Sequence, residues 1–454
     1  MATTVHPETA APAPHVHPTY HEVTRDIAAT LGNPSRSYFL LFGFVLLVLA
    51  AGALALLYQI RYGLGVAGYT PPVMWGVYIT TFVFWVGIAH SGTLISAILY
   101  LFRSAWRTAV YRTAEAMTVF AVMTAGLFPL IHVGRLWYAY WLIPYPNQRG
   151  LWVNFKSPLI WDVFAVSTYF TVSTLFLIVG LIPDVAALRD KATGWRQKLY
   201  EATALGWRGT DQQWRHYTKA YLYLAALATP LVLSVHSVVS WDFAMSIVPG
   251  WHATIFAPYF VAGAIYSGVA MVVTLIVPIR KVFKLERYIT VVHFENLAKL
   301  LLLTGMIVEY AYVTEYFVAW YSGNPYERAS FWNRAFGDYW WATWTMLLCN
   351  GVLPLLLWFP KVRRSIPALF VMSLFVNLGM WFERFVIIVV SLSFEYEPYA
   401  MGHYTPSWVD WTILAGSFAW FFMWFLLFAK NFPTVSITEV KEIIPMPRRK
   451  GAHA

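Results

Sequence analysis

Three ionisable residues stand in hydrophobic segments where a membrane-spanning stretch would normally exclude charge. His132 and Arg135 lie in FPLIHVGRLWYAY, and Asp162 lies in SPLIWDVFAVSTYF. An ionisable side chain at such depth costs roughly 2.5–3.5 kcal/mol on insertion scales, so it is retained mainly where it faces another helix, a ligand or water. Histidine exchanges protons near neutral pH, and a carboxylate can receive the proton next. His132 and Asp162 therefore predict a catalytic site that takes protons from a bound molecule.

The spacing places His132 near one membrane face. We expect one helix over 113–142, with His132 about nine residues before its outer end, or ~14 Å along the helix axis. Arg135, three residues further on, is expected to share the same helix face and to tune the site by its charge. Pro129 removes one helix hydrogen bond and is expected to kink the helix beside the histidine.

A hydroquinone suits this chemistry, because its oxidation releases two protons together with two electrons. The next span is expected to begin at Ser157–Pro158, an N-cap and N1 pair, with Asp162 in its first turns at the same face. Trp137, Tyr138 and Trp161 are candidate flat walls for a bound ring. In the alternative interpretation, which stays open, the ionisable residues pair only with one another and fasten the helices.

Further polar residues in the later spans are candidates for a proton path. They are His236, Asp242, His252 (expected to open span six), Glu309, Glu315, Glu383 and Arg384. Chains of carboxylates and histidines carry protons in membrane proteins, and similar residues also form purely structural ion pairs. Because adjacent residues on a helix do not face each other, Glu383 and Arg384 are expected to need partners on other helices.

The composition predicts an integral membrane protein that is all α-helical. Of 454 residues, 59% are hydrophobic and 12% are charged, whereas a soluble domain is about 25% charged. We expect a flexible cytoplasmic tail over 1–37, a membrane domain over 38–430 and a cytoplasmic tail over 431–454. The ten expected transmembrane helices are 38–60, 72–101, 113–142, 158–182, 219–241, 252–278, 287–319, 338–359, 366–391 and 408–430.

Basic residues predict the orientation of these spans. The loops and tails on the side of the two termini hold 24 of the 32 lysines and arginines. Five lie on the other side, namely Arg61, Arg149, Lys156, Arg328 and Arg334, and three lie within expected spans, namely Arg135, Lys299 and Arg384. Cytoplasmic loops carry such an excess, so both termini are expected in the cytoplasm. The net charge of +10 is explained in the same way and gives no reason to expect nucleic acid.

The sequence gives no sign of a built-in redox centre or metal site. The single cysteine, Cys349, excludes a cysteine-ligated iron–sulfur cluster and a C-x-x-C-H haem attachment. The histidines within spans occur one per span, which argues against a haem b that needs paired ligands at repeated depths. No nucleotide-binding motif occurs, and every loop is short, so a partner must supply any large extramembrane machinery.

Several segments in this order resemble the NrfD/PsrC family of quinone-interacting membrane subunits. They are MWGVYITTFVFWVGIAHSGTLISAIL at 74–99, the IHVGR and WDVF pieces, HSVVSWDF at 236–243 and NLGMWFERF at 377–385. Within the family the chain is most similar to ActC-type membrane subunits of bacterial alternative complex III, and the paralogous ActF type is the nearest alternative.

The resemblance implies two four-helix bundles, spans 2–5 and 6–9, flanked by spans 1 and 10. It also implies a bacterial inner-membrane subunit that oxidises menaquinol or ubiquinol in the first bundle near the periplasmic face. Electrons would pass to an iron–sulfur subunit and a multihaem cytochrome c subunit outside, beside a paralogous NrfD-like subunit and lipids, with proton translocation as an added role. The alternatives are a PsrC-like or ActF-like anchor with a structural or proton-path role, and a secondary transporter, which would usually show broken helices around a central site.

Overall fold

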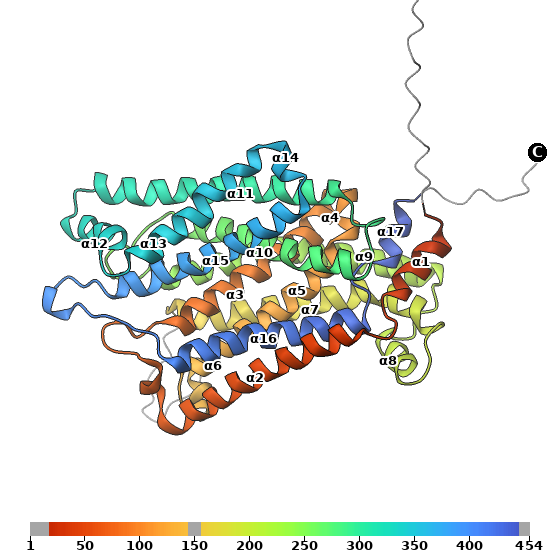
Figure 1. Ribbon diagram of the computed structural model, residues 1–454, viewed down its shortest axis with the longest axis horizontal. Helices are drawn as coiled ribbons and strands as arrows, with labels where there is room; N and C mark the ends of the chain where they lie inside the picture. Colours follow the sequence, from red (N-terminus) through yellow and green to blue (C-terminus); the bar gives the residue numbers. More distant parts are fainter. Residues whose placement is uncertain (1–17, 144–155, 445–454) are drawn as a thin grey trace, which may run out of the picture.

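The computed structural model describes residues 18–143 and 156–444, and its regular structure there is entirely helical (Figure 1). The outer parts of the two expected tails, 1–17 and 445–454, and the loop at 144–155 lie outside the described residues. The helices run mostly along one direction, with α1 (Tyr20–Ala29) and α17 (Ile437–Glu442) together at one end. We call this end the terminal face, and the other end, where α12 (Pro325–Phe336) lies, the opposite face.

Within residues 18–143 and 156–444, ten helices are long and apolar enough to cross a membrane, which confirms the predicted number. The first five spans are α2 (Arg36–Tyr62), α3 to α4 (Val77–Leu101), α5 and α6 (Tyr111–His132), α7 (Pro158–Arg189) and α9 (Asp211–Ala244). The second five are α10 (Phe256–Val282), α11 (Val291–Tyr321), α13 to η6 (Trp340–Trp358), α15 to η7 (Ile366–Val390) and α16 (Trp408–Asn431). Single π-helical turns interrupt three of them, at Leu94–Ile98, Leu348–Val352 and Val386–Val390.

The spans pack as the two predicted bundles. In the first, α3 packs against α5, α5 against α7, and α7 against α9, and in the second α10 packs against α11 and α15. The two bundles meet where α3 lies along α10 (Figure 1). A Cβ on Gly268 of α10 would stand 2.5 Å from the carbonyl oxygen of Ile88 on α3, so only glycine permits this close approach.

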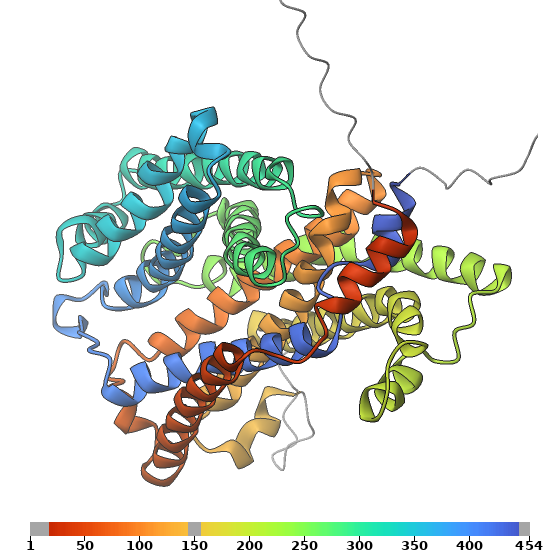
Figure 2. The ribbon, with the colours of Figure 1, turned by 45° about the vertical axis from the view of Figure 1, so that its right-hand side comes forward.

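Spans one and ten lie side by side outside the first bundle, as Figures 1 and 2 both show. Gly52 of α2 faces Gly416 of α16 so closely that a Cβ on Gly52 would stand 2.7 Å from the Cα of Gly416. α16 also contacts α5 and α3, whereas α2 exposes most of its apolar side chains. The exposed face of α2 is therefore the face that a bilayer would cover.

Helix boundaries differ most from the sequence expectation at three places. The third span ends at His132, and the chain continues as a short 3₁₀ segment, η4 (Leu136–Leu142), instead of one helix over 113–142. At the terminal face both α7 and α9 are longer than expected. α7 continues to Arg189, and α9 already begins at Asp211. Spans assigned from hydropathy follow the apolar residues and not the helix itself. The expected third span therefore includes the apolar 3₁₀ segment, and the expected fourth and fifth spans omit polar helix turns outside the hydrocarbon layer.

The segments expected as flexible tails contain docked helices. α1 begins at a Thr19 N-cap with a capping box to Glu22, and its Val23 and Ile27 are buried. α17 buries Ile437 and Val440 against the terminal face of the first bundle. The amphipathic pattern of each segment explains this, because burial of its apolar face compensates for the entropy of ordering a short helix. Between α7 and α9 a further short helix, α8 (Trp195–Thr203), lies at the same face.

The shared position of α1 and α17 supports a testable orientation. Reporter fusions after residue 150 and after residue 400 are expected to report an extracytoplasmic location, because the basic excess lies on the terminal side. A fusion after residue 205, in the loop before α9, serves as the control and is expected to report the cytoplasm. A cytoplasmic signal from either of the first two fusions would show that the orientation is wrong.

Candidate functional site

His132 is the last residue of α6 (Leu127–His132), not a residue in the middle of a long helix. α5 (Tyr111–Ala125) and α6 are separated at Gly126, one turn before Pro129, whose ring has no N–H to continue the helix hydrogen bonds. Gly134 then takes a φ of +76°, which turns the chain away. The helix is thus interrupted close to Pro129, and the end of α6 presents the half-buried imidazole. Its Nδ1 atom is buried and has no hydrogen-bond partner among the described residues.

Tyr69, in the loop between the first two spans, lies edge-on to the His132 ring with their centroids 5.6 Å apart. It stacks on Tyr404, with ring centroids 5.4 Å apart, and its buried hydroxyl has no hydrogen-bond partner within the described part of the chain. Burial raises the pKa of Tyr69 well above its usual value, so the phenol stays neutral and keeps its proton. Tyr69 can therefore donate a hydrogen bond to a ligand beside His132.

Gln59, the fully buried polar residue of the first span, fixes the backbone next to His132. Its Nε2 donates to the carbonyl oxygen of Ile131 at 3.0 Å, and its Oε1 accepts from Tyr78 at 2.6 Å. Asp410, buried on α16, lies close to Tyr78 and accepts a hydrogen bond from the backbone N–H of Ser407 at 2.8 Å. Gln59 and Asp410 were not predicted as site residues. The available signal was a single glutamine in the apolar run LALLYQI.

Asp162 is the fifth residue of α7 and is 7% exposed, as expected for a residue in the first turns. Pro158 occupies N1, whereas the side chain of Ser157 makes no cap hydrogen bond. The carboxyl of Asp162 lies against that of Asp242 on α9, and each retains a buried Oδ1 without a hydrogen-bond partner among the described residues. Two carboxylates in contact cannot both be charged at low cost, so the pair shares a proton.

The structure places His132 and Asp162 at the same end of the first bundle without joining them. No hydrogen bond or ion pair connects these two described residues, whereas η4 contacts both α6 and α7. Asp242, predicted as part of a proton path, is the residue that contacts Asp162. The three side chains thus leave buried nitrogen and oxygen atoms free for a ligand at the opposite face.

The predicted ring-binding residues separate into two groups. Arg135 is exposed and lies outside the helix, because Gly134 ends the helical path, so its expected place on the face of His132 is wrong. Trp137 is 58% exposed, and Tyr138 stacks on Trp141 with ring centroids 4.5 Å apart. Trp161 lies edge-on to Trp241, 5.9 Å away, which places an aromatic pair directly beside the Asp162–Asp242 pair.

Glu383 and Arg384 have the expected partners on other helices, but they also pair with each other, which was not expected. Glu383 Oε1 lies 2.8 Å from Arg384 Nη1, although the atoms are not aligned as a hydrogen bond. The rule that adjacent helical residues point apart describes Cβ positions, and two long side chains enclosed by other helices can bend together. Tyr312 of α11 donates to Glu383 Oε2, and Arg384 also stacks on Phe260, 4.4 Å from the ring centroid.

Three other proton-path candidates lie apart from His132. Glu315 is buried on α11 with an unpartnered Oε1, and Glu309, on the same helix, is half-buried. His252 does not open span six, because α10 begins at Phe256 and His252 is exposed in the preceding loop. The loop sequence SIVPGWHATI is apolar enough to extend a hydropathy window beyond the true helix start.

His236 lies in the core of the first bundle against His90 of α3, with ring centroids 4.7 Å apart. Both imidazoles are fully buried, and Tyr169 stacks on His90, also at 4.7 Å. The sequence does not indicate that His90 and His236 meet, since nothing in one span shows which residue of another span it will contact. The His90–His236 pair therefore places polar groups deeper inside the first bundle than His132 and Asp162, which lie at the opposite face.

A buried ionic cluster at the terminal face was not predicted. Arg112 of α5 lies within 3.1 Å of both Glu115 and Asp184, and all three are fully or nearly fully buried. α17 joins the cluster, because the backbone N–H of Thr438 donates to Asp184 at 2.8 Å. The expected spans 113–142 and 158–182 leave Arg112 and Asp184 outside the helices, whereas the longer helices of the structure include both residues and bring them together.

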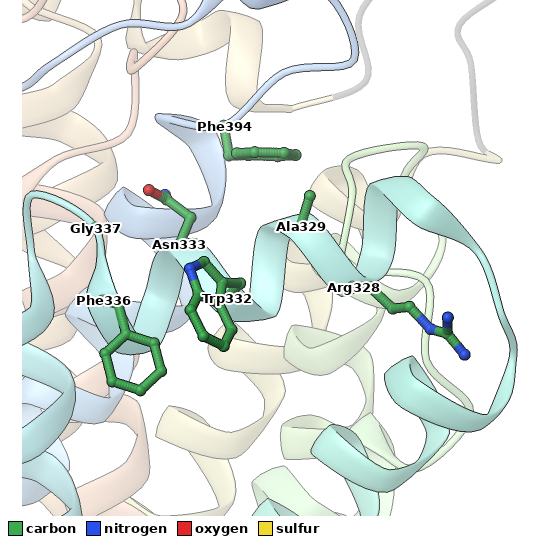
Figure 3. A pocket seen from close by; sticks show the side chains of 7 residues that line it. All are labelled: Arg328, Ala329, Trp332, Asn333, Phe336, Gly337 and Phe394. Carbon is green, nitrogen blue, oxygen red and sulfur yellow. The ribbon is translucent and has the colours of Figure 1, made fainter.

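Figure 3 shows an open pocket on the opposite face, separate from His132. Trp332 and Phe336 lie on one side of α12, and Phe394 lies across the helix from them. The volume of this pocket is about 590 Å³, and its lining contains no carboxylate or imidazole. The pocket therefore lacks the groups for proton transfer. Among the described residues no group of three or more His, Cys, Asp or Glu side chains is placed to hold a metal ion.

Comparisons with known proteins agree with this architecture. The family described as polysulphide reductase, NrfD, matches residues 65–394. The chain is 28% identical to a putative dimethyl sulfoxide reductase membrane subunit of Halobacterium salinarum, over 79% of this chain and 78% of the relative. It is 23% identical to a selenate reductase subunit of Mesobacillus selenatarsenatis, over 78% of this chain and 81% of the relative.

A third relative is the Hdr-like menaquinol oxidoreductase integral membrane subunit of Archaeoglobus fulgidus. It is 20% identical to this chain, over 90% of this chain and 97% of the relative. The family match covers spans two to nine in full and so includes both bundles. The chain therefore belongs to the NrfD polysulphide reductase family, whose members are quinone-interacting membrane subunits of oxidoreductase complexes.

Proposed function

We propose that this chain binds a quinol at the opposite face of the first bundle and oxidises it within a multisubunit complex. The observation that carries the proposal is the group of buried, unpartnered atoms on His132, Asp162 and Asp242 at one end of the bundle. Buried polar atoms are normally hydrogen-bonded, so a group of them at a membrane face indicates a ligand site. One relative is named as a menaquinol oxidoreductase subunit, which supports menaquinol ahead of ubiquinol.

The chemistry needs two proton acceptors and an electron acceptor. Oxidation of a quinol breaks two O–H bonds and yields a quinone, two protons and two electrons. His132 accepts one proton at Nδ1, and the Asp162–Asp242 pair, which already shares a proton, accepts the second. Tyr69 donates a hydrogen bond that orients a ring oxygen, and Trp161 with Trp241 lies beside the ring. The electrons leave to a redox centre of a partner subunit.

The partners proposed here are an iron–sulfur subunit and a multihaem cytochrome c subunit at the periplasmic side, with a paralogous NrfD-like subunit, as in alternative complex III. The single cysteine of the chain supports an external electron acceptor. A second assembly is favoured by two relatives, whose names place them in dimethyl sulfoxide and selenate reductases. In that assembly the same quinol site feeds electrons to a reductase.

The test is quinol-dependent reduction of the partner's redox centre in the purified complex, followed by absorbance. Reduction by a menaquinol analogue is expected, and addition of each candidate terminal acceptor in turn identifies the assembly. Dithionite reduces the centres independently of the quinol site and is the control. Centres that dithionite reduces and quinol does not would contradict the proposal, and so would solute transport without reduction, the behaviour of a secondary transporter.

Proton translocation is a further part of the proposal, and it centres on the second bundle. Glu383, Arg384, Tyr312 and Glu315 form a buried polar group there, in which Glu383 pairs with Arg384 and Tyr312 and one oxygen of Glu315 has no hydrogen-bond partner among the described residues. Glu383→Gln keeps the shape of the side chain and removes its proton exchange. We expect this variant to lower the ratio of protons moved to electrons transferred in proteoliposomes more than it lowers electron transfer.

The matched control is Glu295→Gln on α11. Glu295 binds Lys299 and Arg364, two largely exposed cations, near the terminal face, so its loss is expected to leave the ratio unchanged. A normal proton-to-electron ratio in Glu383→Gln would show that the Glu383–Arg384 pair is structural.

A further inference from the structure

A cavity of about 630 Å³ opens at the terminal face, far from His132. It lies between the last turns of α7, the loop that precedes α9, and α17, with Tyr20 of α1 at its edge. Figure 1 shows α17 and α1 gathered at this end. None of the residues proposed for quinol chemistry lines the cavity, so it requires a separate explanation.

The lengths of the flanking helices place this cavity at the level of the lipid headgroups. α7 has 32 residues and α9 has 34, which correspond to about 48 and 51 Å at 1.5 Å per residue. The hydrocarbon core of a bilayer is about 30 Å thick, or 40–45 Å with the headgroups. Because the cavity is lined by the final turns of α7 and the first turn of α9, it lies beyond the hydrocarbon core.

The charges of the cavity leave two cations without a counter-ion. Arg189 is occupied, since its Nε binds Asp190 at 3.0 Å and its Nη1 donates to the carbonyl oxygen of Trp207 at 3.2 Å. Arg208 and Lys441 form no ion pair within the described part of the chain. The remaining acidic group of the lining is Glu442.

The surroundings of Lys441 and Glu442 favour an added anion. Burial lowers the pKa of Lys441, the nearby Lys191 lowers it further, and Asp184 opposes them. Burial also raises the pKa of Glu442, so this carboxylate is a poor internal counter-ion. An anionic group between Arg208 and Lys441 would relieve the unfavourable placement of these cations.

Two tryptophans form an apolar wall beside these cations. Trp207 and Trp214 meet edge to face with ring centroids 5.0 Å apart, and both are half-buried. Tryptophan prefers the membrane–water interface, where its ring contacts the glycerol and upper acyl region while its N–H reaches polar groups. A free phosphate would use the cations alone, whereas a phospholipid would use both the cations and this wall.

We propose that this cavity binds the headgroup of an anionic phospholipid. Arg208 and Lys441 contact the phosphate, and Trp207 and Trp214 contact the glycerol and the first acyl carbons. Because α7, the loop before α9 and α17 all line the cavity, the lipid stabilises the docked position of α17. Basic pockets between transmembrane helices on the cytoplasmic side are a known physical solution for binding such headgroups.

The test is titration of the detergent-purified full chain with phosphatidylglycerol, measured as bound lipid by native mass spectrometry. Arg208→Gln/Lys441→Gln is expected to weaken binding about 30-fold relative to wild type. The matched control is Lys198→Gln/Lys281→Gln, which removes two exposed cations outside the cavity lining. The control is expected to bind phosphatidylglycerol as wild type does, and phosphatidylcholine is expected to bind weakly to every variant.

Three outcomes would overturn the proposal. Equal weakening in both double variants would show non-specific attraction to the basic face. Equal binding of phosphatidylcholine and phosphatidylglycerol to the wild type would exclude an anion site. Displacement of phosphatidylglycerol by inorganic phosphate at similar concentration would show a free-anion site in which the tryptophan wall has no part.

Discussion

His132→Ala and Asp162→Asn are each expected to lower quinol oxidation at least ~10-fold in a complex that still assembles. Loss of a general base typically costs roughly 10²–10⁴ in rate, and the smaller bound allows for water acting in its place. His132 lies at a helix end and makes no hydrogen bond through Nδ1, so the alanine variant removes no fold-stabilising hydrogen bond from that atom. Asp162→Asn keeps the volume of the side chain and removes its capacity to accept a proton.

Asp242→Asn is expected to resemble Asp162→Asn, because the two carboxyls share one proton. Two exposed residues serve as controls. His216 is exposed near the start of α9, and Asp338 has 82% of its side-chain surface exposed. His216→Ala and Asp338→Asn are expected to keep wild-type turnover. If turnover in both His132→Ala and Asp162→Asn also stays near wild type, these residues only fasten the helices.

Arg112→Gln is expected to destabilise the chain by about 3–5 kcal/mol, the typical cost of removing one partner from a buried ion pair. Arg112 is fully buried and contacts Glu115 and Asp184, so its loss leaves two carboxylates without their cation. It also donates to the carbonyl oxygen of Gly180 at 2.6 Å. Thermal unfolding in detergent, followed by circular dichroism, measures the effect.

Arg25→Gln is the matched control for Arg112→Gln. Arg25 pairs with Asp26 at 3.1 Å, but 61% of the Arg25 side-chain surface is exposed, so the pair is worth at most about 1 kcal/mol. The control is expected to unfold close to the wild-type temperature. Equal unfolding temperatures for Arg112→Gln and wild type would show that the buried cluster does not stabilise the first bundle.

The ten spans could be predicted because hydropathy responds directly to burial in lipid, whereas the two bundles followed from the family resemblance. The same property produced the error at the third span, where the apolar segment LWYAYWL continues the hydrophobic run after the helix has ended. Pro129 and Gly134 mark that ending, and of these only Pro129 was used. The mistaken position of Arg135 follows from this boundary.

Contacts between helices were the part that sequence could not supply. Asp162 and Asp242 were each recognised, yet no pattern along the chain shows that residues 80 positions apart touch. Tyr69 lies in a loop and carries no motif, so its place against His132 depends on the path of that loop. Gln59 was a visible signal, but a search confined to ionisable residues misses it because it carries no charge.

The most direct test of the quinol site is a density map of the assembled complex with a bound quinone analogue. The proposed chemistry predicts a ring oxygen within hydrogen-bond distance of His132 Nδ1, with the ring beside Trp161 and its second oxygen toward the Asp162–Asp242 pair. A quinone ring bound at another location, with His132 and Asp162 out of its reach, would contradict the proposed site.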